Sequence, residues 1–116
     1  MTDTLKKRTS EDIWFDMDCT NLLNTSETIT SVVSVAADQT GLTFGSPVIN
    51  GQAITYPDGR AAAIGKVIRV KIAGGSISAG AKENRYTVRA VFNTNDGSNK
   101  REATVVMVVT NEPEEV

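Results

Sequence analysis

Apolar residues recur at every second position along much of this chain, and this pattern restricts it to β-structure. The clearest case is a set of apolar residues spaced two apart: Tyr86, Val88, Ala90 and Phe92. The same spacing recurs in the set Ile68, Val70 and Ile72. In an extended chain each set faces one side, whereas a helix would spread it around the surface. The alternation therefore predicts half-buried strands.

Further segments show strand patterns and are separated by turn residues. They cover 13–19, 28–35, 42–44, 48–49, 53–56 and 103–109, in addition to 66–72 and 86–92. Asn50-Gly51 tolerates the positive φ angles of a type I′ turn, so we expect a hairpin there. Pro57-Asp58-Gly59 predicts a second turn. With no amphipathic helix, about seven short strands indicate an antiparallel β-sandwich.

The chain has 116 residues, enough for one compact domain. We expect the sandwich to span residues 12–110 between two flexible ends. Residues 1–11 are polar, carry the cationic cluster Lys6, Lys7 and Arg8, and are predicted to form an N-terminal arm. Residues 111–116 are predicted to form an acidic C-terminal tail. Cys19 is in phase with the inward residues of its strand and is predicted to lie in the core.

Composition excludes most catalytic chemistry. The chain has no histidine and one cysteine, which removes histidine bases, serine and cysteine triads, zinc sites and an intrachain disulfide. We therefore expect no enzyme activity and no cofactor. The net charge of −2 makes a nucleic-acid partner unlikely on composition. Without a long apolar run or a signal peptide, we expect a protein made in the cytoplasm with no membrane partner.

Two charged groups were candidates for chemistry. Asp12, Asp16 and Asp18 share one face of the first strand, but a calcium ion takes six to eight oxygens, usually from a loop. We therefore favour a solvated strand face over a metal site or a glycosidase acid–base pair. A stripe of outward cations could bind phosphate or an acidic surface, or could be ordinary paired surface charge: Arg69, Lys71, Arg85 and Arg89.

Apolar residues on outward faces are the better candidates for binding a partner. In the last strand, Val106 and Val108 are out of phase with the inward residues, and Val91 joins them if the last two strands form a hairpin. Either a partner or another part of the same chain would cover them. Trp14 is also out of phase, and tryptophan is favoured at interface hot spots. It could instead cover the open edge of the sandwich.

Several segments resemble parts of a known group of proteins. The run Tyr86–Phe92, the Asn/Asp/Gly turn and Lys100–Val105 resemble the last hairpin of small immunoglobulin-like proteins encoded among the virion genes of tailed bacteriophages. Asp12–Asp16 is similar to the opening strand of that group, and Gly41–Gly45 and Gly74-Gly75 match two later segments. The chain departs from the pattern in lacking an aromatic residue over 28–35 and in having an extra loop at 82–84.

The resemblance implies an immunoglobulin-like sandwich and a structural role in the virion. The expected function is a capsid decoration or cement protein, present in multiple copies and bound to the major capsid protein or other virion proteins. The alternative is an adhesion module of the tail, neck or fibre that binds host glycan or protein through loops such as 74–84. The expected partner-binding residues combine the candidates above: Lys6, Lys7, Arg8, Trp14, Val91, Val106 and Val108.

Overall fold

The protein is all-β in the computed structural model, which describes residues 3–97 and 100–111. The ten strands are β1 (Asp3–Arg8), β2 (Ile13–Asp18), β3 (Ile29–Ala37), β4 (Leu42–Phe44), β5 (Val48–Ile49), β6 (Ile54–Thr55), β7 (Ala61–Ala62), β8 (Val67–Gly74), β9 (Glu83–Thr94) and β10 (Lys100–Thr110). A 3-10 turn, η1, covers Thr20–Leu22. No helix in the described ranges has the length and apolar character of a membrane span.

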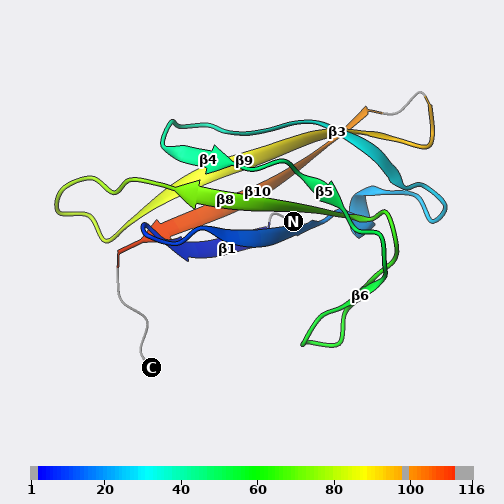
Figure 1. Ribbon diagram of the computed structural model, residues 1–116, viewed down its shortest axis with the longest axis horizontal. Helices are drawn as coiled ribbons and strands as arrows, with labels where there is room; N and C mark the ends of the chain where they lie inside the picture. The colour runs from blue at the N-terminus through cyan, green and yellow to red at the C-terminus, as the bar shows by residue number, and fades with distance from the viewer. Residues whose placement is uncertain (1–2, 98–99, 112–116) are drawn as a thin grey trace.

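The strands form two layers and one separate hairpin (Figure 1). Sheet A has the order β1-β10-β9-β3, and sheet B has the order β2-β8-β4, with β5 also paired to β8. Strand β1 runs parallel to β10, whereas the other pairs are antiparallel. Strands β6 and β7 pair only with each other and extend away from both sheets. The predicted all-β class is therefore confirmed as a sandwich-like arrangement.

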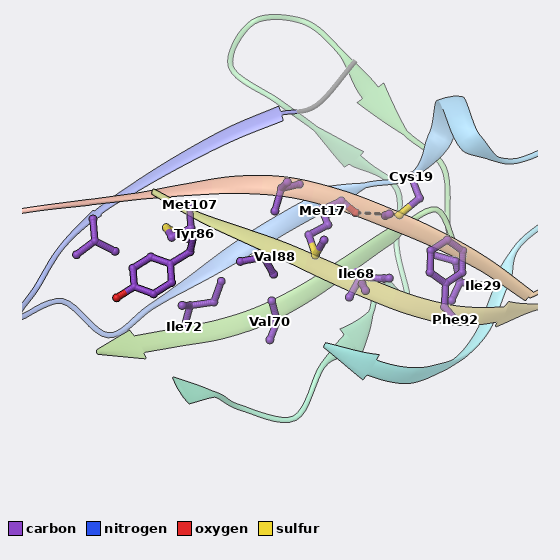
Figure 2. Packing of buried hydrophobic residues seen from close by; sticks show 14 residues of the cluster. Met17, Cys19, Ile29, Ile68, Val70, Ile72, Tyr86, Val88, Phe92 and Met107 are labelled. Atoms are coloured by element: carbon purple, nitrogen blue, oxygen red, sulfur yellow. Dashed lines mark hydrogen bonds between the residues drawn. The ribbon is translucent and has the colours of Figure 1, made fainter. Parts of the chain in front are cut away.

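The core lies between the two sheets and is built from the residues that the alternation marked as inward. Met17, Ile68 and Val70 of sheet B pack against Val88 and Met107 of sheet A (Figure 2). The predicted core position of Cys19 is confirmed, because this residue is fully buried and its thiol donates to the Met17 carbonyl at 3.5 Å. Burial of these apolar side chains holds the two sheets together.

The predicted N-terminal arm is wrong for the residues that form β1. Asp3–Arg8 pairs with Val105–Thr110 over six residue pairs, so the sandwich includes residues from Asp3 onward rather than from residue 12. Leu5 packs against the core, and Lys7 is only 1% exposed. The Lys7 ammonium donates to the carbonyls of Gly74 at 2.5 Å and Arg8 at 2.6 Å. Of the predicted C-terminal tail, residues 112–116 lie outside the described residues.

The predicted hairpin at Asn50-Gly51 is also wrong. Strand β5 pairs with β8 and β6 pairs with β7, so the strands on either side of this dipeptide do not meet. The Asn50 side chain is buried instead, and its carbonyl accepts the backbone N–H groups of Gly65, Lys66 and Val67. Gly51 does not have a positive φ, whereas Gly59 has a φ of 91°. The turn predicted at Pro57-Asp58-Gly59 therefore forms, between β6 and β7.

Candidate binding surface

An uncovered apolar hollow lies on the outer face of sheet B. Trp14 on β2 is 52% exposed, and Val48 on β5 is 51% exposed. Val48 and Asp16 pair with Arg69 of β8 on opposite sides, and Trp14 lies two residues before Asp16 on the same face of β2. Trp14, Val48 and Arg69 line a hollow of about 250 Å³. This volume accommodates an apolar side chain from another molecule.

The charged groups around the hollow hold one another in place. The Arg69 guanidinium donates to Asp16 Oδ1 at 2.9 Å, and the Tyr56 hydroxyl donates to Asp16 Oδ2 at 3.4 Å. Lys71 Nζ lies 3.9 Å from Asp12 Oδ2. Since both oxygens of Asp16 have partners, this carboxylate fixes Arg69 beside the apolar hollow.

A second hollow lies between the neighbouring edges of the two sheets. It has a volume of about 190 Å³, and its lining comes from β1, β2 and the β6–β7 turn: Thr4, Leu5, Asp16, Asp18, Tyr56 and Arg60. The Asp18 carboxylate accepts the Thr20 backbone N–H at 3.0 Å and the Thr20 hydroxyl at 2.5 Å. Within residues 3–97 and 100–111, Asp18 has no ion-pair partner.

The electrostatic character of this second hollow is negative. Burial, together with the nearby charges of Asp16 and Asp18, raises the pKa of Tyr56 to about 12, although Arg60 opposes the shift. The Arg60 guanidinium lies 5.1 Å from the Tyr56 ring centroid and is paired with Asp58 at 2.8 Å. Burial is the largest cause of this shift, and the carboxylates of Asp16 and Asp18 add to it because they oppose a further negative charge. We refer to the two hollows together as the Trp14 surface, defined by Trp14, Asp16, Asp18, Val48, Tyr56 and Arg69.

The structure separates the three predicted cationic residues. Lys6 is exposed, whereas Arg8 is half-buried and forms an ion pair with Glu11 at 3.1 Å. Lys7 is buried and bound to carbonyls, so it is not available to a partner, which corrects that part of the prediction. Local charge suggested a uniform patch, but a strand points successive side chains to opposite faces.

The predicted valine patch is also smaller than expected. Val108 is only 6% exposed, and Val91 and Val106 are half-buried. In the register, Val108 lies between Lys6 of β1 and Arg85 of β9, so long side chains flank it on the same face. Val108 is therefore not available to a partner as predicted, because its own chain covers it. Trp14, in contrast, is exposed on the face where the alternation placed it.

Sequence reasoning missed Val48 and Tyr56. Val48 lies in a two-residue strand that reaches Trp14 only because both β2 and β5 pair with β8. Tyr56 belongs to a hairpin outside both sheets and reaches Asp16 across 40 positions of sequence. No local pattern marks such contacts.

The outward cations that were candidates for a binding stripe form ion pairs with neighbouring carboxylates. Arg69, Arg85 and Arg89 are paired with Asp16, Glu83 and Glu102, at N–O distances of 2.9, 2.8 and 2.6 Å. The cations predicted as a possible stripe therefore belong to different ion pairs. No group of three or more histidine, cysteine, aspartate or glutamate residues is arranged to hold a metal ion within the part of the chain that the structure describes.

Comparisons with known proteins identify no relative of this chain. No protein-family model, no curated protein and no solved structure matches the chain.

Proposed function

We propose that this protein is an immunoglobulin-like structural component of a tailed-bacteriophage virion, and that many copies decorate the outer shell through the Trp14 surface. The observation that carries the binding role is the exposed pair Trp14 and Val48 around one hollow, with Arg69 held between them. The virion setting follows from the sequence resemblance.

The order of the strands supports the immunoglobulin-like part of the proposal. In constant-type immunoglobulin domains one sheet contains strands C, F and G, and the other contains A, B, E and D. The neighbours β3, β9 and β10 correspond in sequence order to C, F and G, and β2, β8 and β4 correspond to B, E and D. The first strand differs from that arrangement, because β1 pairs with β10 and not with β2.

A buried tyrosine gives a second line of support. Many immunoglobulin-like sandwiches have a tyrosine near the start of strand F whose hydroxyl binds the backbone a few residues upstream. Tyr86 is the fourth residue of β9 and is fully buried. Its hydroxyl accepts the Ser76 backbone N–H at 2.9 Å and donates to the Ser76 carbonyl at 3.3 Å. This contact joins the β8–β9 connection to the strand that follows it.

The size of the surface suits a repeated attachment. A hollow of about 250 Å³ with one exposed tryptophan makes a small individual contact. Where copies on a shell also contact one another, each further contact forms at a high effective concentration, so modest contacts become strong together. A decoration protein therefore needs an exposed anchor of this kind rather than a deep cleft.

Sedimentation with shells tests the proposal. Shells are purified from particles of the phage that encodes the chain, stripped of this protein and mixed with the wild type or with Trp14→Ala. We expect the wild type to sediment with the shells, and Trp14→Ala to bind about tenfold more weakly or worse, because truncating a central tryptophan removes a hot spot. Val33→Ala is the matched control, because Val33 is also 52% exposed but lies on β3 of sheet A.

Imaging separates the decoration role from the tail alternative. Particles labelled with an antibody against the protein should show staining over the head. Staining confined to the tail, or equal sedimentation of the wild type and Trp14→Ala, would contradict the proposal.

A further inference from the structure

We infer that the Trp14 surface binds an extended protein segment carrying a basic side chain about four residues from an aliphatic one. This inference rests on the proposed function, since it specifies the partner of the same surface. The aliphatic side chain fills the hollow between Trp14 and Val48, and the basic side chain reaches Asp18 in the hollow between β1 and β2.

The apolar half of the inference follows from the hollow that Trp14, Val48 and Arg69 line. Trp14 and Val48 each leave about half of their surface in water. Covering them with an aliphatic side chain is favourable by about 25 cal/mol for each Å² removed from water. The guanidinium of Arg69 is held by Asp16, so it borders the hollow without filling it.

The charged half of the inference follows from which of the three carboxylates on one strand face have a cationic partner. Asp12 and Asp16 have cationic partners in Lys71 and Arg69. Asp18 accepts only uncharged donors from Thr20 among the residues that the structure describes. Its charge is therefore available to a partner cation, and the raised pKa of Tyr56 agrees with a negative potential in this hollow. A lysine or arginine side chain is complementary to this charge.

The extended conformation follows from the position of the second hollow. Strand β1 is the last strand of sheet A, and β2 is the last strand of sheet B. Thr4 and Leu5 of β1 line this hollow together with Asp16 and Asp18 of β2. Edge strands present unpaired backbone N–H and C=O groups, and an extended chain is the form that can use them.

The spacing of the two side chains follows from β2 itself. Trp14 and Asp18 lie on the same face, four residues apart along an extended strand. Val48 is level with Asp16, because both pair with Arg69, so the Trp14 end of the hollow is the end farther from Asp18. At about 3.3 Å per residue that end is about 13 Å from Asp18 along β2, and an extended partner whose aliphatic side chain contacts Trp14 spans this distance with four residues.

Two synthetic peptides test the inference directly. Both are blocked heptapeptides of threonine and serine with valine at the second position, and they differ only in lysine or glutamate at the sixth. The protein has one tryptophan, so its indole N–H gives a single nuclear magnetic resonance signal from this surface. We expect the lysine peptide to shift that signal saturably and the glutamate peptide to bind about tenfold more weakly or worse. Equal binding, or no binding of the lysine peptide, would overturn the inference.

A charge-neutral variant tests the role of Asp18. Asp18→Asn keeps a side-chain oxygen that can accept the Thr20 hydrogen bonds and removes the charge. We expect it to lose most of the preference for the lysine peptide, whereas Glu102→Gln on sheet A retains it. Thermal unfolding of both variants verifies that they are folded. An unchanged preference in folded Asp18→Asn would overturn the inference.

The shell assay keeps this inference distinct from the proposed function. If the wild type and Asp18→Asn sediment equally well with shells, the assignment of Asp18 fails while shell attachment stands. If the wild type fails to sediment but prefers the lysine peptide, shell attachment fails while the chemistry assigned to the surface is supported. Weaker sedimentation of Asp18→Asn than of Glu102→Gln supports both.

Discussion

The outer faces of the two sheets both carry apolar side chains, but they differ in how those side chains are covered. On sheet A, Val108 is buried because strands on both sides place Lys6 and Arg85 next to it. On sheet B, Trp14 lies on the edge strand β2, and Val48 lies on β5, which has only two residues. Trp14 and Val48 therefore remain about half exposed. An outward apolar residue marks a binding surface only where neighbouring strands leave it uncovered.

Removing β1 is the strongest test of this comparison. A variant lacking residues 1–8 loses the pairing with β10, the core contact of Leu5 and the cover over Val108. We expect it to lose several kcal/mol of a total stability of about 5–15 kcal/mol and to associate through the free edge of β10. Urea unfolding and sedimentation velocity measure the two effects.

Lys6→Gln is the control for that deletion, because it changes the charge of β1 and keeps the strand. A truncated protein that stayed monomeric with the wild-type free energy of unfolding would show that β1 does not cover sheet A in solution.

Placing the same charged residue on each face sharpens the comparison. In Val108→Asp the carboxylate lies at a buried position, and we expect a loss of about 3 kcal/mol or more in unfolding free energy. In Val48→Asp it lies at a half-exposed position, where the expected change is within about 0.5 kcal/mol. Chemical denaturation of both variants measures the difference, and similar losses for the two would remove the distinction between the faces.

The buried ammonium of Lys7 makes the stability of the β1 region depend on pH. Burial lowers the pKa of Lys7 from its ordinary value of 10.5, despite the opposing charges of Glu11 and Asp12. Between the lowered pKa and 10.5, the unfolded chain binds more protons than the folded protein. The contribution of Lys7 to stability therefore rises with pH across this window.

Comparison of Lys7→Met with the exposed-site variant Lys6→Met isolates this effect. The free energy of unfolding of both variants is measured from neutral pH to above about pH 10.5. We expect Lys6→Met to retain the rise in stability that Lys7 causes and Lys7→Met to lack it. The same pH dependence in both variants would mean that Lys7 is solvated in solution.

The smallest expected effect concerns Tyr56 on the Trp14 surface. Its pKa is raised to about 12, from an ordinary 10.0, so the unfolded chain releases this proton at lower pH than the folded protein. The contribution of Tyr56 to stability therefore falls as pH rises through that interval. Ultraviolet absorbance of the phenolate should show a step near 12 that Tyr56→Phe removes and Asp18→Asn shifts downward. A Tyr56 step at its ordinary pKa would contradict a negative potential at this surface.

The sequence predicted the strands whose faces differ strongly in polarity. Tyr86, Val88, Ala90 and Phe92 alternate with mostly polar residues, and all four are fully buried in β9. The alternation also placed Trp14 on the outer face. These predictions succeed because a strand with one buried face must keep its apolar residues in phase.

Contacts between distant segments account for what the sequence did not predict. Strand β1 looked like an arm because its charges are visible locally, whereas the carbonyl of Gly74 that binds Lys7 is 67 positions away. Asn50-Gly51 suggested a turn because nothing local shows that the Asn50 side chain binds the backbone of residues 65–67. The Trp14 surface has the same origin, since β8 brings Trp14 and Val48 together.

The parallel pairing of β1 and β10 has a mechanical consequence. Tension applied at the start of β1 and at the end of β10 pulls the two strands in opposite directions along their length. Six residue pairs between Asp3↔Val105 and Arg8↔Thr110 then carry the load together in shear, rather than opening one after another. A protein attached at both ends would resist stretching through this pair before its core is loaded, and its lifetime under force would depend on the rate at which these strands slide apart.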